Sequence, residues 1–145
     1  MEPRISLVTL GVDDLDRAVA FYEAMRLRRY GKVTEGVAFF QMGGIILALW
    51  PREELAADAG FAPEVAKAAP RFTGTALAYN TRTVDEVAAL LAQAEAAGGR
   101  VLKHATRAPW GGTQGYFQDT EGHLWEVAYN PDFLIDAEGR IALPE

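Results

Sequence analysis

The most constraining feature of this chain is that its two halves repeat one order of elements. Apolar alternation predicts strands and three- or four-residue apolar spacing predicts helices, so each half reads strand, helix, strand, strand, strand. The halves match best near their ends: Phe40-Gln41 aligns with Phe117-Gln118, and residues 46–49 align with 124–127. Two βαβββ modules predict an α+β fold in which a curved, cup-shaped sheet carries helices on its outside.

The chain length of 145 residues predicts a single domain. Its middle stretch, rich in alanine and charge and interrupted by prolines, predicts a connector with short helical turns at 52–59 and 63–68. The last residues predict a small hairpin that turns at 136–139 and covers an edge or a pocket mouth. The expected parts are a first module (4–50), a connector (51–71), a second module (72–131) and a C-terminal tail (132–145).

Local signals place the elements within each module. Asp13 or Asp14 is expected to cap the first helix, and Thr83 followed by Glu86 matches a capping box for the second, which ends at Gly98. The strands expected in the first module are 5–12, 30–33, 37–41 and 45–50. Those expected in the second are 72–79, 100–104 and the two arms of a hairpin that turns at 119–122.

Composition narrows the function classes. Half of the residues are hydrophobic, enough for an ordinary core, and the net charge of −6 argues against nucleic acid and anionic membranes as partners. The absence of cysteine excludes disulfides, zinc–thiolate sites, iron–sulfur clusters and a cysteine nucleophile. No signal-peptide pattern and no membrane-length apolar run is present, so we expect a cytoplasmic protein.

The run from His123 to Tyr129 places one carboxylate among apolar neighbours. Strand alternation puts Leu124, Glu126 and Ala128 on one face and the aromatic residues on the other. A buried carboxylate without a partner is costly, so Glu126 is either neutralised, hydrogen-bonded to a tyrosine, tryptophan or arginine in the wall of the expected cup, or functional. In use, it suits proton transfer or the binding of a cation.

Two motifs resemble the vicinal oxygen chelate superfamily. They are Val12-Asp13-Asp14-Leu15-Asp16-Arg17-Ala18 through Phe21-Tyr22, and the stretch from Gly115 to Val127. The resemblance covers residues 4–131 and implies the fold of glyoxalase I, the bleomycin and fosfomycin resistance proteins and the extradiol dioxygenases. Because that fold hosts isomerases, lyases, dioxygenases and pure binding proteins, the resemblance leaves open whether this chain is an enzyme.

The resemblance also implies where a metal would bind. Metal-dependent members take ligands from the first and last strand of each repeat, which here correspond to Leu7, Ala48, a position near Thr75, and Glu126. Only Glu126 offers a good donor, whereas a divalent metal needs three or four. We therefore expect no metal at the family position and no cofactor. A divalent metal completed by water or by a partner chain is the alternative.

The ligand-binding candidates follow from the same positions and from nearby aromatic residues. Trp50 shares the face of Ala48, and Trp110 lies in a glycine-flanked loop where it could act as a gate. Glu126 is also the candidate catalytic residue. The full candidate set is Leu7, Ala48, Trp50, Thr75, Trp110, Tyr116 and Glu126.

Three functional hypotheses remain. The first is a homodimeric glyoxalase/bleomycin-resistance-like protein that binds a small organic molecule in an apolar cup without the family metal. The second is a lyase, isomerase or dioxygenase of the same superfamily, either metal-dependent or assisted by Glu126. The third is a non-catalytic homodimeric scaffold whose cup is filled by its own side chains.

Overall fold

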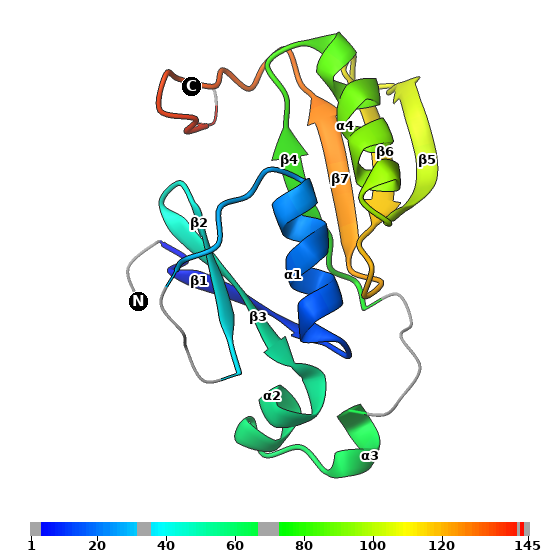
Figure 1. The fold of residues 1–145 in the computed structure, drawn as a ribbon. Coiled ribbons are helices and arrows are strands. Elements are labelled where there is room, and N and C mark those ends of the chain that lie inside the picture. Colours follow the sequence, from blue (N-terminus) through cyan, green and yellow to red (C-terminus); the bar gives the residue numbers. More distant parts are fainter. Residues whose placement is uncertain (1–3, 32–35, 67–72, 142, 144–145) are drawn as a thin grey trace. The chain divides into compact units, whose positions relative to one another are not determined.

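The structure, a computed structural model, describes residues 4–31, 36–66, 73–141 and 143 (Figure 1). The chain forms two compact units, Met1–Thr73 and Gly74–Glu145, and each unit has its own sheet. Within these described ranges, no helix is both long and apolar enough to cross a membrane.

The first unit is a helix packed on a three-stranded sheet of order β1-β3-β2. Strand β3 is central: β1 runs parallel to it and β2 antiparallel. Arg29 adds an isolated antiparallel bridge to Phe40 on β2, where the sequence predicts a further strand at 30–33, although residues 32–33 lie outside the described ranges. The elements are β1 (Leu7–Val12), α1 (Leu15–Ala24), β2 (Ala38–Met42), β3 (Ile45–Pro51), α2 (Arg52–Asp58) and α3 (Pro63–Ala66).

Helix α1 begins and packs as its sequence predicts. Asp14 is the N-cap, and its Oδ1 accepts a 3.0 Å hydrogen bond from the backbone nitrogen of Arg17. The buried face of the helix includes Phe21 and Tyr22, and the Tyr22 ring lies 5.8 Å from that of Phe40 on β2. This contact identifies the sheet face that α1 covers, which also carries Leu47 and Leu49 in the core.

The second unit repeats this topology with a complete four-stranded sheet of order β4-β7-β6-β5. Strand β4 runs parallel to β7, whereas β6 runs antiparallel to both β7 and β5. In both units the last strand is central and pairs in parallel with the first, so the predicted α+β fold of two βαβββ modules is confirmed. The elements are β4 (Leu77–Asn80), α4 (Val84–Ala96), β5 (Arg100–Arg107), β6 (Thr113–Gln118) and β7 (Leu124–Tyr129).

Strand register confirms the alignment of the two halves residue by residue. Phe40 lies opposite Leu47 in the first unit, and Phe117 lies opposite Trp125 in the second. The glutamine after each phenylalanine donates to the backbone of its own hairpin: Gln118 Nε2 reaches the carbonyl of Gly122 at 3.2 Å, and Gln41 acts likewise on its own turn. The repeat therefore includes the residues that fix each turn.

Helix α4 covers one face of the second sheet (Figure 1). Its start carries the predicted capping box, in which Glu86 Oε2 accepts from the backbone nitrogen of Thr83 at 3.3 Å. The helix lies so close to β6 that a Cβ on Gly115 would collide with Leu91 Cδ1 and stand 2.7 Å from the carbonyl oxygen of Lys103. Side chains that alternate with Gly115 along β6 point to the other face, which α4 does not cover.

Several predicted bounds shift. Strand β4 begins at Leu77 rather than at 72, a residue outside the described ranges, and β5 continues to Arg107 rather than ending at 104. Both predicted turns of the connector form helices, α2 and α3, although residues 67–68 at the end of the second prediction lie outside the described ranges.

The C-terminal tail forms the predicted turn and is attached to the second unit. Ile135 bridges Ile141, and the backbone nitrogen of Asp136 donates to the carbonyl of Arg140 at 3.0 Å. The Arg82 guanidinium donates to the carbonyl oxygens of Ile135 at 2.7 Å and Asp136 at 2.6 Å. Hydrogen bonds from the backbone and then the guanidinium of Arg140 lower the pKa of Asp136.

Candidate functional site

Glu126 lies half-buried in the middle of β7, on the sheet face opposite α4. Its cross-strand partner on β6 is Tyr116, whose hydroxyl donates a 3.0 Å hydrogen bond to Glu126 Oε1. Of the states that the sequence left open for this carboxylate, the structure shows hydrogen bonding to a wall residue. The bond engages one carboxylate oxygen, so it is compatible with use of the other.

Gln114 is a second donor to the same carboxylate oxygen. With its amide nitrogen turned toward Glu126, that nitrogen lies 2.9 Å from Oε1 and the amide oxygen lies 3.2 Å from Lys103 Nζ. In the opposite orientation, the amide oxygen would face the Glu126 carboxylate oxygen and the amide nitrogen would face the Lys103 ammonium, so neither contact could be a hydrogen bond. The Lys103 ammonium also lies 5.9 Å from the centre of the Tyr116 ring. Four side chains from β5, β6 and β7 thus form one polar group.

The arrangement leaves Glu126 Oε2 as an open acceptor. Both donors converge on Oε1, and no described side chain or backbone group donates to Oε2. Burial, followed by the hydrogen bond to Glu126 and the charge of that carboxylate, raises the pKa of Tyr116 above its ordinary value of 10.0. Tyr116 therefore stays a donor at neutral pH, and Oε2 can accept a hydrogen bond, a cation or a proton.

Sequence analysis identified Tyr116 and Glu126 but missed Gln114 and Lys103. Gln114 had a usable signal, because it stands two residues before Tyr116 and therefore on the same face of the strand. Lys103 had none, because the pairing of β5 with β6 shifts register on both sides of it. Alternation counted along β5 does not predict which face Lys103 takes.

In the first unit, the candidates Leu7, Ala48 and Trp50 share the face of the sheet that α1 does not cover. Leu7 begins β1 opposite Ile46, while Ala48 and Trp50 follow Ile46 at alternate positions of β3. Ala48 is buried, and Trp50 Nε1 donates to Glu54 Oε2 at 3.0 Å, which ties the indole to α2. In the first unit, the positions equivalent to Glu126 and its neighbours on the same face therefore carry apolar side chains.

Thr75 is exposed and precedes β4. Ala78 lies opposite Glu126 on β4, just as Thr9 lies opposite Ala48 on β1. Counting back two residues from each, the equivalent of Leu7 is Ala76, one residue from the predicted Thr75. The position thus carries a methyl group instead of a hydroxyl.

Trp110 packs on its own loop. A Cβ on Gly112 would overlap the Trp110 ring and the carbonyl oxygen of Tyr129, so the glycine is required by close contact. The ring is partly exposed, at 45%. The adjoining pair Thr113–Tyr129 stands three positions along the ladder from Tyr116–Glu126, and no hydrogen bond or ring contact links the Trp110 side chain to that pair.

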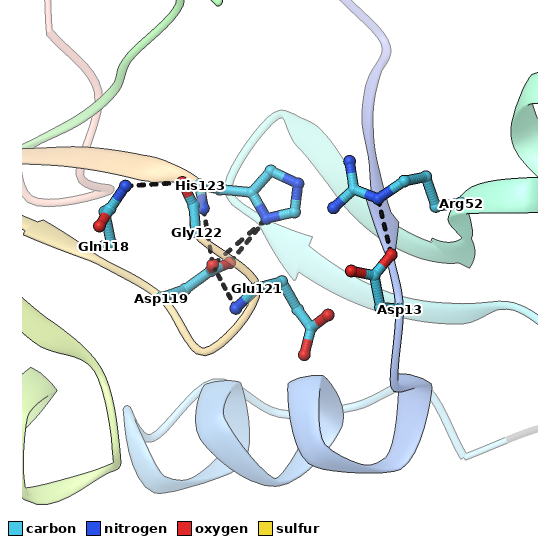
Figure 2. A network of polar contacts seen from close by, with 7 residues as sticks. All are labelled: Asp13, Arg52, Gln118, Asp119, Glu121, Gly122 and His123. Carbon is cyan, nitrogen blue, oxygen red and sulfur yellow. Dashed lines mark hydrogen bonds and ion pairs between the residues drawn. The ribbon is translucent and has the colours of Figure 1, made fainter. Parts of the chain in front are cut away.

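The hairpin turn between β6 and β7 is fixed by a buried aspartate (Figure 2). Asp119 Oδ1 accepts from the backbone nitrogens of Glu121 at 2.9 Å and His123 at 2.8 Å, and Oδ2 lies 3.0 Å from His123 Nδ1. This network holds the start of β7 and thereby the register that places Glu126. In the first unit, Arg52 pairs with Asp13 (Figure 2), and Arg52 Nε lies 2.7 Å from Asp13 Oδ1. Asp13 therefore pairs with α2, while Asp14 caps α1.

The donor set at the family metal positions does not fit a divalent ion. The side chains of Leu7, Ala48 and Ala76 have no donor atom, and Glu126 already accepts two hydrogen bonds on one oxygen. Among the described residues, no three His, Asp or Glu side chains cluster so that they could hold a metal. His123 is turned toward Asp119 instead.

Comparisons with known proteins identify the family and the fold. The model of the Glyoxalase/Bleomycin resistance protein/Dioxygenase superfamily matches residues 4–127. A glyoxalase-related enzyme from Fulvimarina pelagi is 35% identical, with a TM-score of 0.87 over 99% of each chain. A glyoxalase/bleomycin resistance protein/dioxygenase from Nocardioides is 25% identical, with a TM-score of 0.71 over 89% of this chain and 84% of its own.

The fold alone is shared with a fosfomycin resistance protein, FosX, from Listeria monocytogenes. That protein is 21% identical, with a TM-score of 0.67 over 90% of this chain and 95% of its own. The comparison with curated proteins finds no match.

Proposed function

We propose that this chain, which belongs to the Glyoxalase/Bleomycin resistance protein/Dioxygenase superfamily, binds a small, partly apolar organic molecule without the family metal. The ligand would lie on the face of the second sheet that carries Glu126. One observation carries the proposal: Glu126 is half-buried with Oε1 doubly hydrogen-bonded, and no described residue donates to Oε2. Such an oxygen favours a ligand that presents a hydrogen-bond donor, above all a protonated amine.

The proposal that no metal is needed rests on the donors present. Of the family metal positions, one keeps a carboxylate, Glu126, and the others carry alanine or leucine. This carboxylate can bind a hydrogen-bond donor of the ligand directly, without a metal between them. Elemental analysis after dialysis against zinc, nickel, manganese and iron tests this point. A stoichiometric, tightly held metal would contradict it.

Ligand binding is tested with ammonium compounds and their neutral isosteres, for example benzylammonium against benzyl alcohol. We expect the ammonium member of a pair to bind more tightly by calorimetry, and Glu126→Gln to raise its Kd roughly ten- to hundredfold because a charge-assisted hydrogen bond is lost. Glu95→Gln on the exposed side of α4 removes the same charge elsewhere in the unit and should leave Kd unchanged. Equal binding to wild type and Glu126→Gln would overturn the proposal.

A second candidate function is an enzyme in which Glu126 moves a proton. It is favoured by the protein from Fulvimarina pelagi, whose description as a glyoxalase-related enzyme accompanies 35% identity over 99% of both chains. This version expects Glu126→Gln to abolish turnover with little loss of ligand affinity or stability. Loss of affinity without any detectable reaction would favour the binding protein instead.

We further propose that the protein acts as a cytoplasmic homodimer. The support is that β4 and β5 are edge strands of the second sheet, and that β5 carries the exposed side chain of Leu102, at 45%. Sedimentation equilibrium tests this, and a monomer at micromolar concentration would contradict it. A dimer that binds no member of the ligand panel would support the scaffold alternative.

A further inference from the structure

We infer that Lys103 and Gln114 form a positioning arm that fixes the Glu126 carboxylate and keeps its Oε2 available to the ligand. The inference rests on the proposed function at Glu126. It assigns a role in ligand affinity to two residues that act through the carboxylate rather than by touching the ligand.

The first step is the orientation of the Gln114 amide. Its nitrogen faces Glu126 Oε1 at 2.9 Å and its oxygen faces Lys103 Nζ at 3.2 Å. An amide has distinct donor and acceptor ends, so the cation on one side and the anion on the other select a single orientation. Lys103 therefore reinforces the orientation in which the amide nitrogen of Gln114 meets Glu126.

The second step is that Lys103 is itself held in place. Its backbone pairs with Tyr116, and its ammonium lies 5.9 Å from the centre of the Tyr116 ring. Tyr116 in turn donates to Glu126 Oε1 at 3.0 Å. The four side chains therefore close a ring of contacts in which each member has two neighbours.

The third step is what the amide prevents. An ammonium in direct contact with Glu126 would occupy the carboxylate as an ion pair. Gln114 stands between the two charges and binds each of them, so that Lys103 stabilises the arrangement without pairing with the carboxylate. Two donors on Oε1 also fix the rotation of the carboxylate, which directs Oε2 away from both of them.

A double-mutant cycle with the benzylammonium probe tests the arm. We expect Gln114→Met, which keeps the length of the side chain but removes the amide, to raise Kd about tenfold. Lys103→Met should weaken binding about threefold more in the Gln114 background than in the Gln114→Met background, because Lys103 acts through the amide. Lys103 repels a cationic probe in both backgrounds, and if it pairs with Glu126 in Gln114→Met, the difference between the backgrounds grows in the same direction. Equal effects of Lys103→Met in both backgrounds would overturn the arm.

A matched control separates positioning from general stability. Gln41→Met removes two side-chain hydrogen bonds to the hairpin of the first unit, at 2.6 Å to Gly43 O and 3.1 Å to Ile45 O. Gln41→Met should lower the melting temperature without changing Kd. Gln114→Met should have a melting temperature similar to that of Gln41→Met but a higher Kd. A change in Kd that simply follows the melting temperature in both variants would contradict positioning.

A measurement without ligand keeps the two proposals distinguishable. We expect the side-chain NH₂ resonances of Gln114 to shift in Lys103→Met and again in Glu126→Gln, since both contacts define the amide environment. Resonances that move in neither variant would overturn the arm. Shifted resonances together with no binding of any probe would retain the arm and overturn the proposed function.

Discussion

The hydroxyl of Tyr116 donates a 3.0 Å hydrogen bond to Oε1 of Glu126, its partner across β6 and β7. The equivalent pair in the first unit is Phe39 opposite Ala48, which has no polar atom in either side chain. The two modules therefore share a backbone plan, while this cross-strand position is polar in the second module and apolar in the first. This asymmetry is the reason why the proposed ligand site lies in the second module.

Tyr116 should make stability fall at alkaline pH. Its pKa in the folded state is raised above 10.0, so folding favours the protonated phenol. The contribution is fully present below pH 10 and is lost as pH rises from there through the folded-state pKa. We expect the free energy of unfolding in urea to fall less between pH 9 and 11 in Tyr116→Phe than in wild type. Tyr79→Phe, at a half-exposed side chain on β4, should behave as wild type.

Asp119 should be among the most sensitive polar positions. Its buried carboxylate accepts from two backbone nitrogens and faces His123 Nδ1, so Asp119→Ala leaves three groups without their partner. We expect a loss of about 3 kcal/mol in urea unfolding. Asp119→Asn keeps an oxygen for the backbone donors, and His123 can accept from the new amide after a change of tautomer, so the loss should be about 1 kcal/mol. Losses below about 0.5 kcal/mol in both variants would show that the network contributes little.

The fold could be predicted because its signals are periodic and repeated. The match of Phe40-Gln41 with Phe117-Gln118 aligned the two halves, and the observed strand registers agree with that alignment. The capping positions predicted where both long helices begin. The predicted ends of strands were wrong where strand pairing, rather than residue propensity, determines them. Strand β4 begins where its pairing with β7 begins, at Leu77 opposite Trp125.

The site could be predicted only in part. Glu126 and Tyr116 lie on regular strands, where alternation predicts the face, but Lys103 lies between two register shifts and could not be assigned. The contact of Trp110 with Gly112 depends on the path of a loop, and a loop has no hydrophobic periodicity from which its path could be predicted. The position near Thr75 could be predicted only to within one residue for a similar reason, since it precedes the strand that would fix its register.

Gly115 should not tolerate a side chain. A Cβ there would collide with Leu91 Cδ1 of α4 and stand 2.7 Å from the carbonyl oxygen of Lys103, and the second contact is backbone that cannot rotate away. We expect Gly115→Ala to lower the free energy of unfolding by about 1–3 kcal/mol in urea. Gly44→Ala, in the turn between β2 and β3, meets nothing within 4 Å and should change it by less than about 0.5 kcal/mol.

Arg82 should control the order of the C-terminal tail. Its guanidinium donates to the carbonyls of Ile135 at 2.7 Å and Asp136 at 2.6 Å, and these are the side-chain contacts that fasten the turn to the segment before α4. In Arg82→Met we expect the amide of Asp136, which donates to Arg140 O, to exchange with deuterium about tenfold faster, because local opening loses two charge-assisted hydrogen bonds. The free energy of global unfolding should change by less than about 0.5 kcal/mol.

The matched control for the tail is Arg100→Met, which removes the same charge from an exposed position at the start of β5. It should leave exchange at Asp136 unchanged. If Arg82→Met and Arg100→Met accelerate exchange equally, net charge rather than the two carbonyl contacts governs the tail. If neither variant accelerates exchange, the hydrogen bonds between Asp136 and Arg140 hold the turn without help from Arg82. In that case Arg140→Met should accelerate exchange of the Asp136 amide.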